Sequence, residues 1–220
     1  NYFTGYIFVV MISCLYFNIF NISLIWCLAF LFLSLISTIF IETFRYSINP
    51  IVNTSITFLG ILYVGGLFCS MIALREFDSF NGTNFTLMML ASVWICDSFA
   101  YIFGKSFGKK KLIQRLSPNK TIMGFCAGII GAFISIYTLN YFGIISYNLN
   151  LYSIIILAVI IGVFGQWGDI AESMFKRDAK IKDSGKILMG HGGFLDRCDS
   201  LMITSPLVLL YVLYLQNQIF

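Results

Sequence analysis

Charged residues are scarce in this sequence: they make up 11% of its 220 residues, whereas 59% are hydrophobic and 17% aromatic. The mean hydropathy of +0.87 reflects the same shortage of charge. Such a composition excludes a soluble globular domain, which needs a charged surface. It equally excludes a disordered chain, which has few apolar residues. The composition therefore indicates a polytopic helical membrane protein.

Paired cysteines and clustered histidines are also missing. The six cysteines are scattered singly without a C-x-x-C pair, and the single histidine is His191. This pattern predicts neither a disulfide framework nor a zinc site. No basic stretch precedes the first apolar run after Asn1, so we expect no cleavable signal peptide, and leave open whether residues precede Asn1.

Seven apolar stretches have roughly the 20-residue length that a bilayer demands. They are expected at residues 6–20, 22–41, 56–74, 85–103, 121–142, 151–167 and 201–215. Threaded alternately through a membrane, they leave residues 42–53, 104–120 and 168–200 on one side. That side receives all but Arg75 of the 14 Lys and Arg residues, so the positive-inside rule makes it cytoplasmic.

The whole chain, 1–220, is interpreted as one all-α integral membrane domain of about seven transmembrane helices. Residues 1–90 are expected to form hydrophobic N-terminal helices, and residues 91–200 the catalytic helices and cytoplasmic loops. Residues 201–220 are expected to form the last transmembrane helix. The membrane would be a bacterial-type inner membrane or an organellar one. A homodimer formed through glycine-rich helix faces is left open.

The few charges are concentrated in residues 165–200. If this segment is helical from Asp169 onward, the 0, +3, +4 and +7 positions share a face. That face carries polar side chains: Asp169, Glu172, Ser173 and Lys176. Apolar residues such as Ile170 and Met174 fall on another face. The segment therefore predicts a helix with one face for an ionic ligand and one for packing.

Three aspartates near the membrane predict a metal site. Asp196 and Asp199 lie three residues apart at the start of the last apolar stretch, so they would point the same way. Together with Asp169 they would repel one another unless a cation lay between them. Mg²⁺ prefers oxygen ligands. We therefore expect Asp169, Asp196 and Asp199 to hold one or two Mg²⁺ ions, with an additional monovalent cation left open.

A second polar group precedes this segment. Asp97 lies inside an apolar stretch, where a charge costs about 3 kcal/mol on insertion scales, so it needs a partner. The loop at residues 104–120 is rich in lysine, and residues 117–121 at its end are expected to form a turn followed by the start of a helix. The backbone amides and the positive dipole end of that helix suit a phosphate. We expect Ser117, Lys120 and Thr121 to contact a triphosphate there.

Two quoted stretches carry a family resemblance. The first is GDIAESMFKRDAKIKDSGKILMGHGGFLDRCDS, and the second is DSFAYIFGKSFGKKKLIQRLSPNKTIMGF. Their GD-x-x-ES-x-x-KR, GHGG-x-x-DR-x-DS and SP-x-KT patterns closely resemble the phosphatidate cytidylyltransferases (CDP-diacylglycerol synthases). Met189 stands where that family usually has proline, and Met123 where it often has glutamine or glutamate. Residues 1–90 resemble the family only in being hydrophobic.

The resemblance implies transfer of cytidylyl from CTP to phosphatidate, releasing pyrophosphate, in phospholipid biosynthesis. The implied partners are CTP, phosphatidate and membrane lipid, with no nucleic acid. Positioning and charge neutralisation supply most of the catalysis in such transfers. The expected catalytic residues are Asp169, Lys176, Arg177, His191, Asp196, Arg197 and Asp199. The expected substrate-binding residues are Asp97, Ser117, Lys120, Thr121, Glu172, Ser173, Gly192 and Gly193.

Two roles stay open within this assignment. Glu172 either ligates the metal or orients Lys176, four residues further on. His191, between glycines, either hydrogen-bonds a phosphate or the leaving group, or shapes the loop.

Three rival functions are distinguishable. A CTP-dependent lipid-alcohol kinase would transfer the γ-phosphate and release CDP, but the complete GHGG-x-x-DR-x-DS ending argues against it. A CDP-alcohol phosphotransferase would carry a D-G-x-x-A-R motif, which the sequence lacks. A transporter often shows a repeat across two halves. No such repeat is visible, because charge is nearly absent before Arg75 and dense after Asp97.

Overall fold

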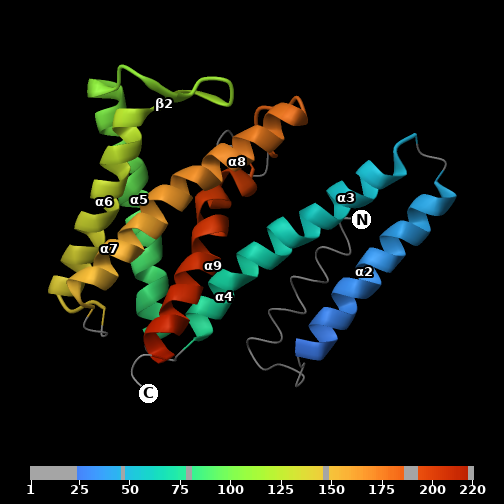
Figure 1. Cartoon of the computed structure of the whole chain (residues 1–220), viewed down its shortest axis with the longest axis horizontal. Coiled ribbons are helices and arrows are strands. Elements are labelled where there is room, and N and C mark those ends of the chain that lie inside the picture. Colours follow the sequence, from blue (N-terminus) through green and yellow to red (C-terminus); the bar gives the residue numbers. More distant parts are fainter. Residues whose placement is uncertain (1–23, 46–47, 78–80, 146–148, 186–192, 218–220) are drawn as a thin grey trace.

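The computed structural model describes residues 24–45, 48–77, 81–145, 149–185 and 193–217 (Figure 1). Five helices in these ranges are long and apolar enough to cross a membrane: Pro50–Glu76, Gly82–Phe107, Ile122–Tyr141, Leu151–Asp178 and Leu195–Gln216. They correspond to the third to seventh expected stretches and confirm an all-α membrane architecture.

The first two expected stretches are not among these five crossing helices. The second coincides with α2 (Leu24–Phe44), of which Leu31–Phe44 counts as a shorter apolar helix. The first, residues 6–20, lies outside the described residues. The total of seven transmembrane helices therefore stays a prediction.

Two of the crossing helices contain a π-helical segment. Pro50–Glu76 consists of α3 (Pro50–Gly60), η2 (Ile61–Leu67) and α4 (Phe68–Glu76). Leu151–Asp178 consists of α7 (Leu151–Val159), η3 (Ile160–Phe164) and α8 (Gly165–Asp178). The apolar stretch and the polar helix expected from Asp169 are thus one continuous helix. A π-turn shifts which side chains share a face, and such turns are frequent at functional sites.

The basic loop between the next two helices contains a β-hairpin. It connects α5 (Asn81–Phe107) to α6 (Ile122–Tyr141) and pairs β1 (Lys111–Ile113) with β2 (Ser117–Thr121) in antiparallel fashion. The turn expected at residues 117–121 is therefore wrong, because β2 is held extended by its pairing with β1.

The expected helix start directly after β2 is confirmed. Thr121 is the N-cap of α6, and its Oγ1 accepts a hydrogen bond from Gly124 N at 3.1 Å. This bond uses the Thr121 hydroxyl to hold the helix start, so its structural role is that of a cap.

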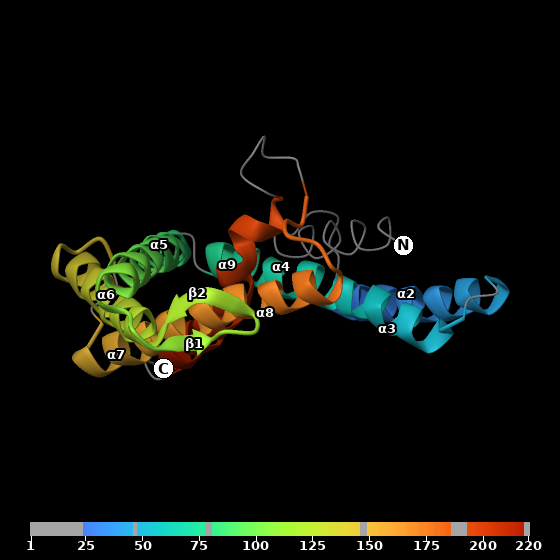
Figure 2. The ribbon, with the colours of Figure 1, turned by 90° about the horizontal axis from the view of Figure 1, so that it is seen from above.

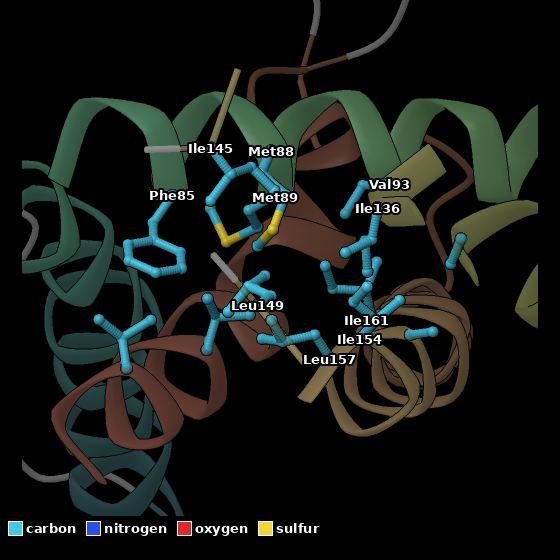
Figure 3. Close-up of a cluster of buried hydrophobic side chains, with 14 of the residues drawn as sticks. Phe85, Met88, Met89, Val93, Ile136, Ile145, Leu149, Ile154, Leu157 and Ile161 are labelled. Carbon is cyan, nitrogen blue, oxygen red and sulfur yellow. The ribbon is translucent and has the colours of Figure 1, made fainter. Parts of the chain in front are cut away.

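The apolar core lies among α5, α6, α7 and α9 (Leu195–Asn217). Figure 3 shows Met88 and Met89 of α5 above Leu157, whose side chain belongs to α7. These three side chains are at most 1% exposed. Lipid is as apolar as such side chains, so close packing holds membrane helices together more than the hydrophobic effect does. The core thereby fixes the positions of α5, α9 and α7, and α7 continues into the polar helix α8.

The α2 and α3 helices form an antiparallel pair on the far side of the molecule from α5 and α6 (Figures 1 and 2). Buried Glu42 joins the pair, because its Oε1 accepts a hydrogen bond from Asn53 Nδ2 at 2.6 Å. Both helices extend into the polar connection expected at residues 42–53, which is therefore shorter than expected. Figure 1 shows the C-terminal end of α2, the beginning of α3, the hairpin and the C-terminal end of α8 towards the top of the view.

Candidate active site

The candidate site lies where α8 crosses the beginning of α9. A Cβ atom at Gly168 would lie 2.6 Å from the backbone oxygen of Asp199, so the approach of the two helices requires glycine at this position. Gly168 therefore serves the close packing of α8 against α9. The close approach also brings Asp169, the next residue of α8, beside Asp199.

Three carboxylates meet at this crossing and form what we call the acidic cluster: Asp169, Glu172 and Asp199. One oxygen atom of each lies within 4.8 Å of those of the other two. Glu172 is 1% exposed and Asp199 is 9% exposed. Glu172 Oε1 is buried and has no hydrogen-bond partner. A hard divalent cation would supply that partner and relieve the repulsion among the carboxylates, so the donor set fits such an ion.

Asp196 has different surroundings from those expected of a metal ligand. Its Oδ1 accepts a hydrogen bond from Lys176 Nζ at 2.7 Å. Its Oδ2 accepts from Ser184 N at 2.9 Å, from Ser184 Oγ at 2.7 Å and from Gly193 N at 2.6 Å. We call these four residues the Asp196 anchor. Of the expected metal set, Asp169 and Asp199 lie in the acidic cluster together with Glu172, whereas Asp196 lies in the Asp196 anchor, where both of its oxygens accept hydrogen bonds.

Lys176 connects the two groups. Its Nζ lies 2.6 Å from Glu172 Oε2 and 2.7 Å from Asp196 Oδ1. The two alternatives for Glu172 are therefore compatible, since Oε2 pairs with Lys176 while Oε1 stays available in the acidic cluster. Lys176 is held between two carboxylates and fixes the spacing of α8 and α9.

Lys120 brings the upstream segment into the same site. Its Nζ lies 2.8 Å from Asp169 Oδ2 and donates a hydrogen bond to the backbone oxygen of Gln166 at 3.0 Å. Asp97 has an exposed side chain on α5, which packs against α6, the helix that begins directly after Lys120 and Thr121. The two segments that resemble one family are thus joined in space by an ion pair.

Four further expected residues lie on α8, α9 and β2. Ser173 Oγ reaches Asp169 Oδ1 only at 3.5 Å, which is long for a hydrogen bond. Arg177 and Arg197 have exposed side chains on α8 and α9, and Ser117 begins β2. Two further expected residues lie outside the described part of the chain: His191 and Gly192.

Two residues of the site were not expected. Gln166 is 4% exposed, and its Nε2 donates hydrogen bonds to the backbone oxygens of Phe125 at 3.0 Å and Gly162 at 2.7 Å. An amide inside an apolar run is a sequence signal for such a role. Tyr63, on η2, has a buried hydroxyl without a hydrogen-bond partner. One tyrosine among 12 carries no comparable signal.

The fold and the site define a helical membrane protein with an acidic, lysine-lined centre at its helix ends. A model of the cytidylyltransferase family matches residues 1–215, and the chain belongs to this family. The match extends through residues 1–90, where the sequence alone showed only hydrophobicity.

Curated relatives agree with this assignment. Proteins named phosphatidate cytidylyltransferase from Staphylococcus haemolyticus, Staphylococcus saprophyticus and Staphylococcus aureus are 43%, 42% and 41% identical to the chain over 150 residues. Each alignment covers 68% of this chain and 55% of the relative, so the chain spans about half the length of the relatives that it matches. The expected family is thereby confirmed.

Proposed function

We propose that this protein transfers cytidylyl from CTP to phosphatidate, giving CDP-diacylglycerol and pyrophosphate. The relatives that match it carry the name of that activity. The observation that carries the proposal is the 2.8 Å ion pair between Lys120 and Asp169. It unites a phosphate-binding candidate with the acidic cluster, and a nucleotidyl transfer needs both in one place.

The acidic cluster is proposed to hold Mg²⁺ through Asp169, Glu172 and Asp199. When bound, the ion would neutralise phosphate charge on the nucleotide. Lys120 lies beside the cluster and is proposed to bind the triphosphate, and Asp97 is proposed as a further substrate-binding residue. Arg177 and Arg197, which are exposed, are proposed to bind further phosphate oxygens. His191 is proposed to donate a hydrogen bond to a phosphate or to the leaving group.

In the proposed reaction a phosphate oxygen of phosphatidate attacks the α-phosphorus of CTP. A bond forms between that oxygen and the α-phosphorus, and the bond from the α-phosphorus to the bridging oxygen of the β-phosphate breaks. Pyrophosphate carries away the electron pair. The attacking phosphate is already largely ionised at neutral pH, so no side chain has to remove its proton. The residues bind, orient and neutralise charge.

The lipid substrate gives a reason for the membrane architecture. Phosphatidate can keep its acyl chains in the bilayer while its phosphate reaches a site at the helix ends. The concentration of lysine and arginine at this end favours a cytoplasmic orientation, the side on which CTP is found.

The test follows the products from CTP labelled separately at the α- and γ-phosphates, using purified protein in phosphatidylcholine nanodiscs. We expect α-label in the lipid and γ-label in pyrophosphate, only when phosphatidate and Mg²⁺ are both present. In parallel nanodiscs that contain a lipid alcohol, transfer of the γ-label to that alcohol with release of CDP would establish a kinase instead. Ion flux in proteoliposomes without CTP turnover would establish a transporter.

A further inference from the structure

Tyr63 lies outside both segments that carry the family resemblance, yet its hydroxyl is buried without a partner. Among the side chains that the structure describes, the other buried polar atom in this condition is Glu172 Oε1. Buried polar atoms in proteins are nearly always hydrogen-bonded, and exceptions commonly mark a missing ion or a functional group. Two such atoms therefore indicate one incomplete site if they are neighbours.

The contacts of Tyr63 make them neighbours. Its ring packs edge-on against Phe175, with centroids 5.3 Å apart and an interplanar angle of 78°. Phe175 lies three residues after Glu172, hence on the same face of α8. Asp199 lies on α9, the helix against which η2 packs. Tyr63 is thus placed within one turn of Glu172 and on a segment that contacts the helix of Asp199.

The backbone around Tyr63 is irregular as well. Tyr63 lies in the π-helical η2, seven residues long, which packs against α9. π-Helical turns are rare in proteins and are frequently found at functional sites. The described residues therefore give three separate observations at one position: an unpaired hydroxyl, proximity to the cluster and a π-turn.

We propose that Tyr63 is a positioning residue of the acidic cluster, whose hydroxyl donates a hydrogen bond to a carboxylate oxygen of Glu172 or Asp199 when a divalent cation binds. The proposal rests on the cation site proposed above. Donors that hold metal-bound carboxylates in orientation are a general requirement of metal sites. No residue of the described signature segments supplies such a donor to Glu172 Oε1.

The test measures Mn²⁺ binding by electron paramagnetic resonance in phosphatidylcholine nanodiscs. Tyr63→Phe removes the hydroxyl alone, and we expect about a 10-fold loss of Mn²⁺ affinity. Tyr137→Phe is the matched control, because Tyr137 is 49% exposed on α6. We expect it to bind Mn²⁺ like the unaltered protein.

Thermal unfolding without cation supplies a second readout. Removing a hydroxyl that lacks a partner should leave the unfolding temperature of Tyr63→Phe unchanged or higher. Unchanged Mn²⁺ affinity in Tyr63→Phe, or an equal fall of unfolding temperature with and without Mn²⁺, would overturn the proposal alone. Failure of the unaltered protein to bind Mn²⁺ would overturn it together with the cation site.

Discussion

Asp196 and Asp199 begin the same helix three residues apart, but their surroundings are opposite. Asp196 accepts hydrogen bonds from Lys176, Ser184 and Gly193, so both of its oxygens are satisfied within the protein. Asp199 lies at the acidic cluster, against Asp169 and Glu172. A satisfied buried carboxylate stabilises the fold, whereas crowded carboxylates are costly until a ligand arrives. The anchor and the cluster should therefore respond differently to the same substitution.

The largest effect is expected at the cluster. Asp199→Asn removes one ligand charge at nearly constant shape, and we expect pyrophosphate formation to fall about 1000-fold, since a cation contributes several kcal/mol to such transfers. The unfolding temperature without cation should be unchanged or higher, because repulsion in the cluster is reduced. Retention of full Mn²⁺ affinity by this variant would contradict the cluster as a cation site.

A somewhat smaller effect is expected at Lys120. Lys120→Met removes the cation that pairs with Asp169, and we expect kcat/KM for CTP to fall about 100-fold through lost charge neutralisation. Lys110→Met is the control, since Lys110 directly precedes β1 and has an exposed side chain. Equal losses in both variants would show that the hairpin acts only through its overall charge.

A substitution in the Asp196 anchor is expected mainly to lower the stability of the fold. Asp196→Asn removes the charge that pairs with Lys176, and we expect a loss of about 2 kcal/mol in the free energy of unfolding. Activity should fall about 10-fold, since Lys176 also positions Glu172. Mn²⁺ affinity should stay much closer to that of the unaltered protein than in Asp199→Asn. The reverse order of affinities would make Asp196 a metal ligand after all.

The smallest effect is expected from one anchor donor. Ser184→Ala removes the hydroxyl that donates to Asp196 at 2.7 Å but keeps the backbone donor of the same residue. We expect a loss of about 1 kcal/mol in the free energy of unfolding, with pyrophosphate formation near that of the unaltered protein. A loss as large as that of Asp196→Asn would mean that the remaining three bonds contribute little.

The sequence predicted the helices and much of the site because charge is rare in it. Each charged residue in an apolar chain needs a partner, so Asp97, Lys120, Asp169 and Asp199 could be assigned to one site before their positions were known. Five crossing helices agree with the expected stretches for the same reason, since length and hydropathy define them.

Other features of the site depend on three-dimensional contacts, which the spacing of residues in the sequence does not reveal. The 0 and +3 spacing places Asp196 and Asp199 on one side, but cannot say that Ser184 and Gly193 donate to one of them. Tyr63 packs against Phe175 of α8 from a π-helical segment, whereas the seven residues Ile61–Leu67 look like an ordinary apolar helix in the sequence. The hairpin was missed because residues 117–121 have turn composition, while their backbone pairs with β1.

The length of the continuous helix Leu151–Asp178 determines how far Asp169 lies from the opposite end of the membrane span. At ~1.5 Å per residue, Asp169 stands about 27 Å from Leu151 along the helix axis. The hydrocarbon layer of a bilayer is about 30 Å thick, so a helix that enters at Leu151 delivers its first carboxylate to the level where lipid headgroups begin. In the proposed reaction, this height would let a lipid phosphate meet the nucleotide while the acyl chains stay in the leaflet.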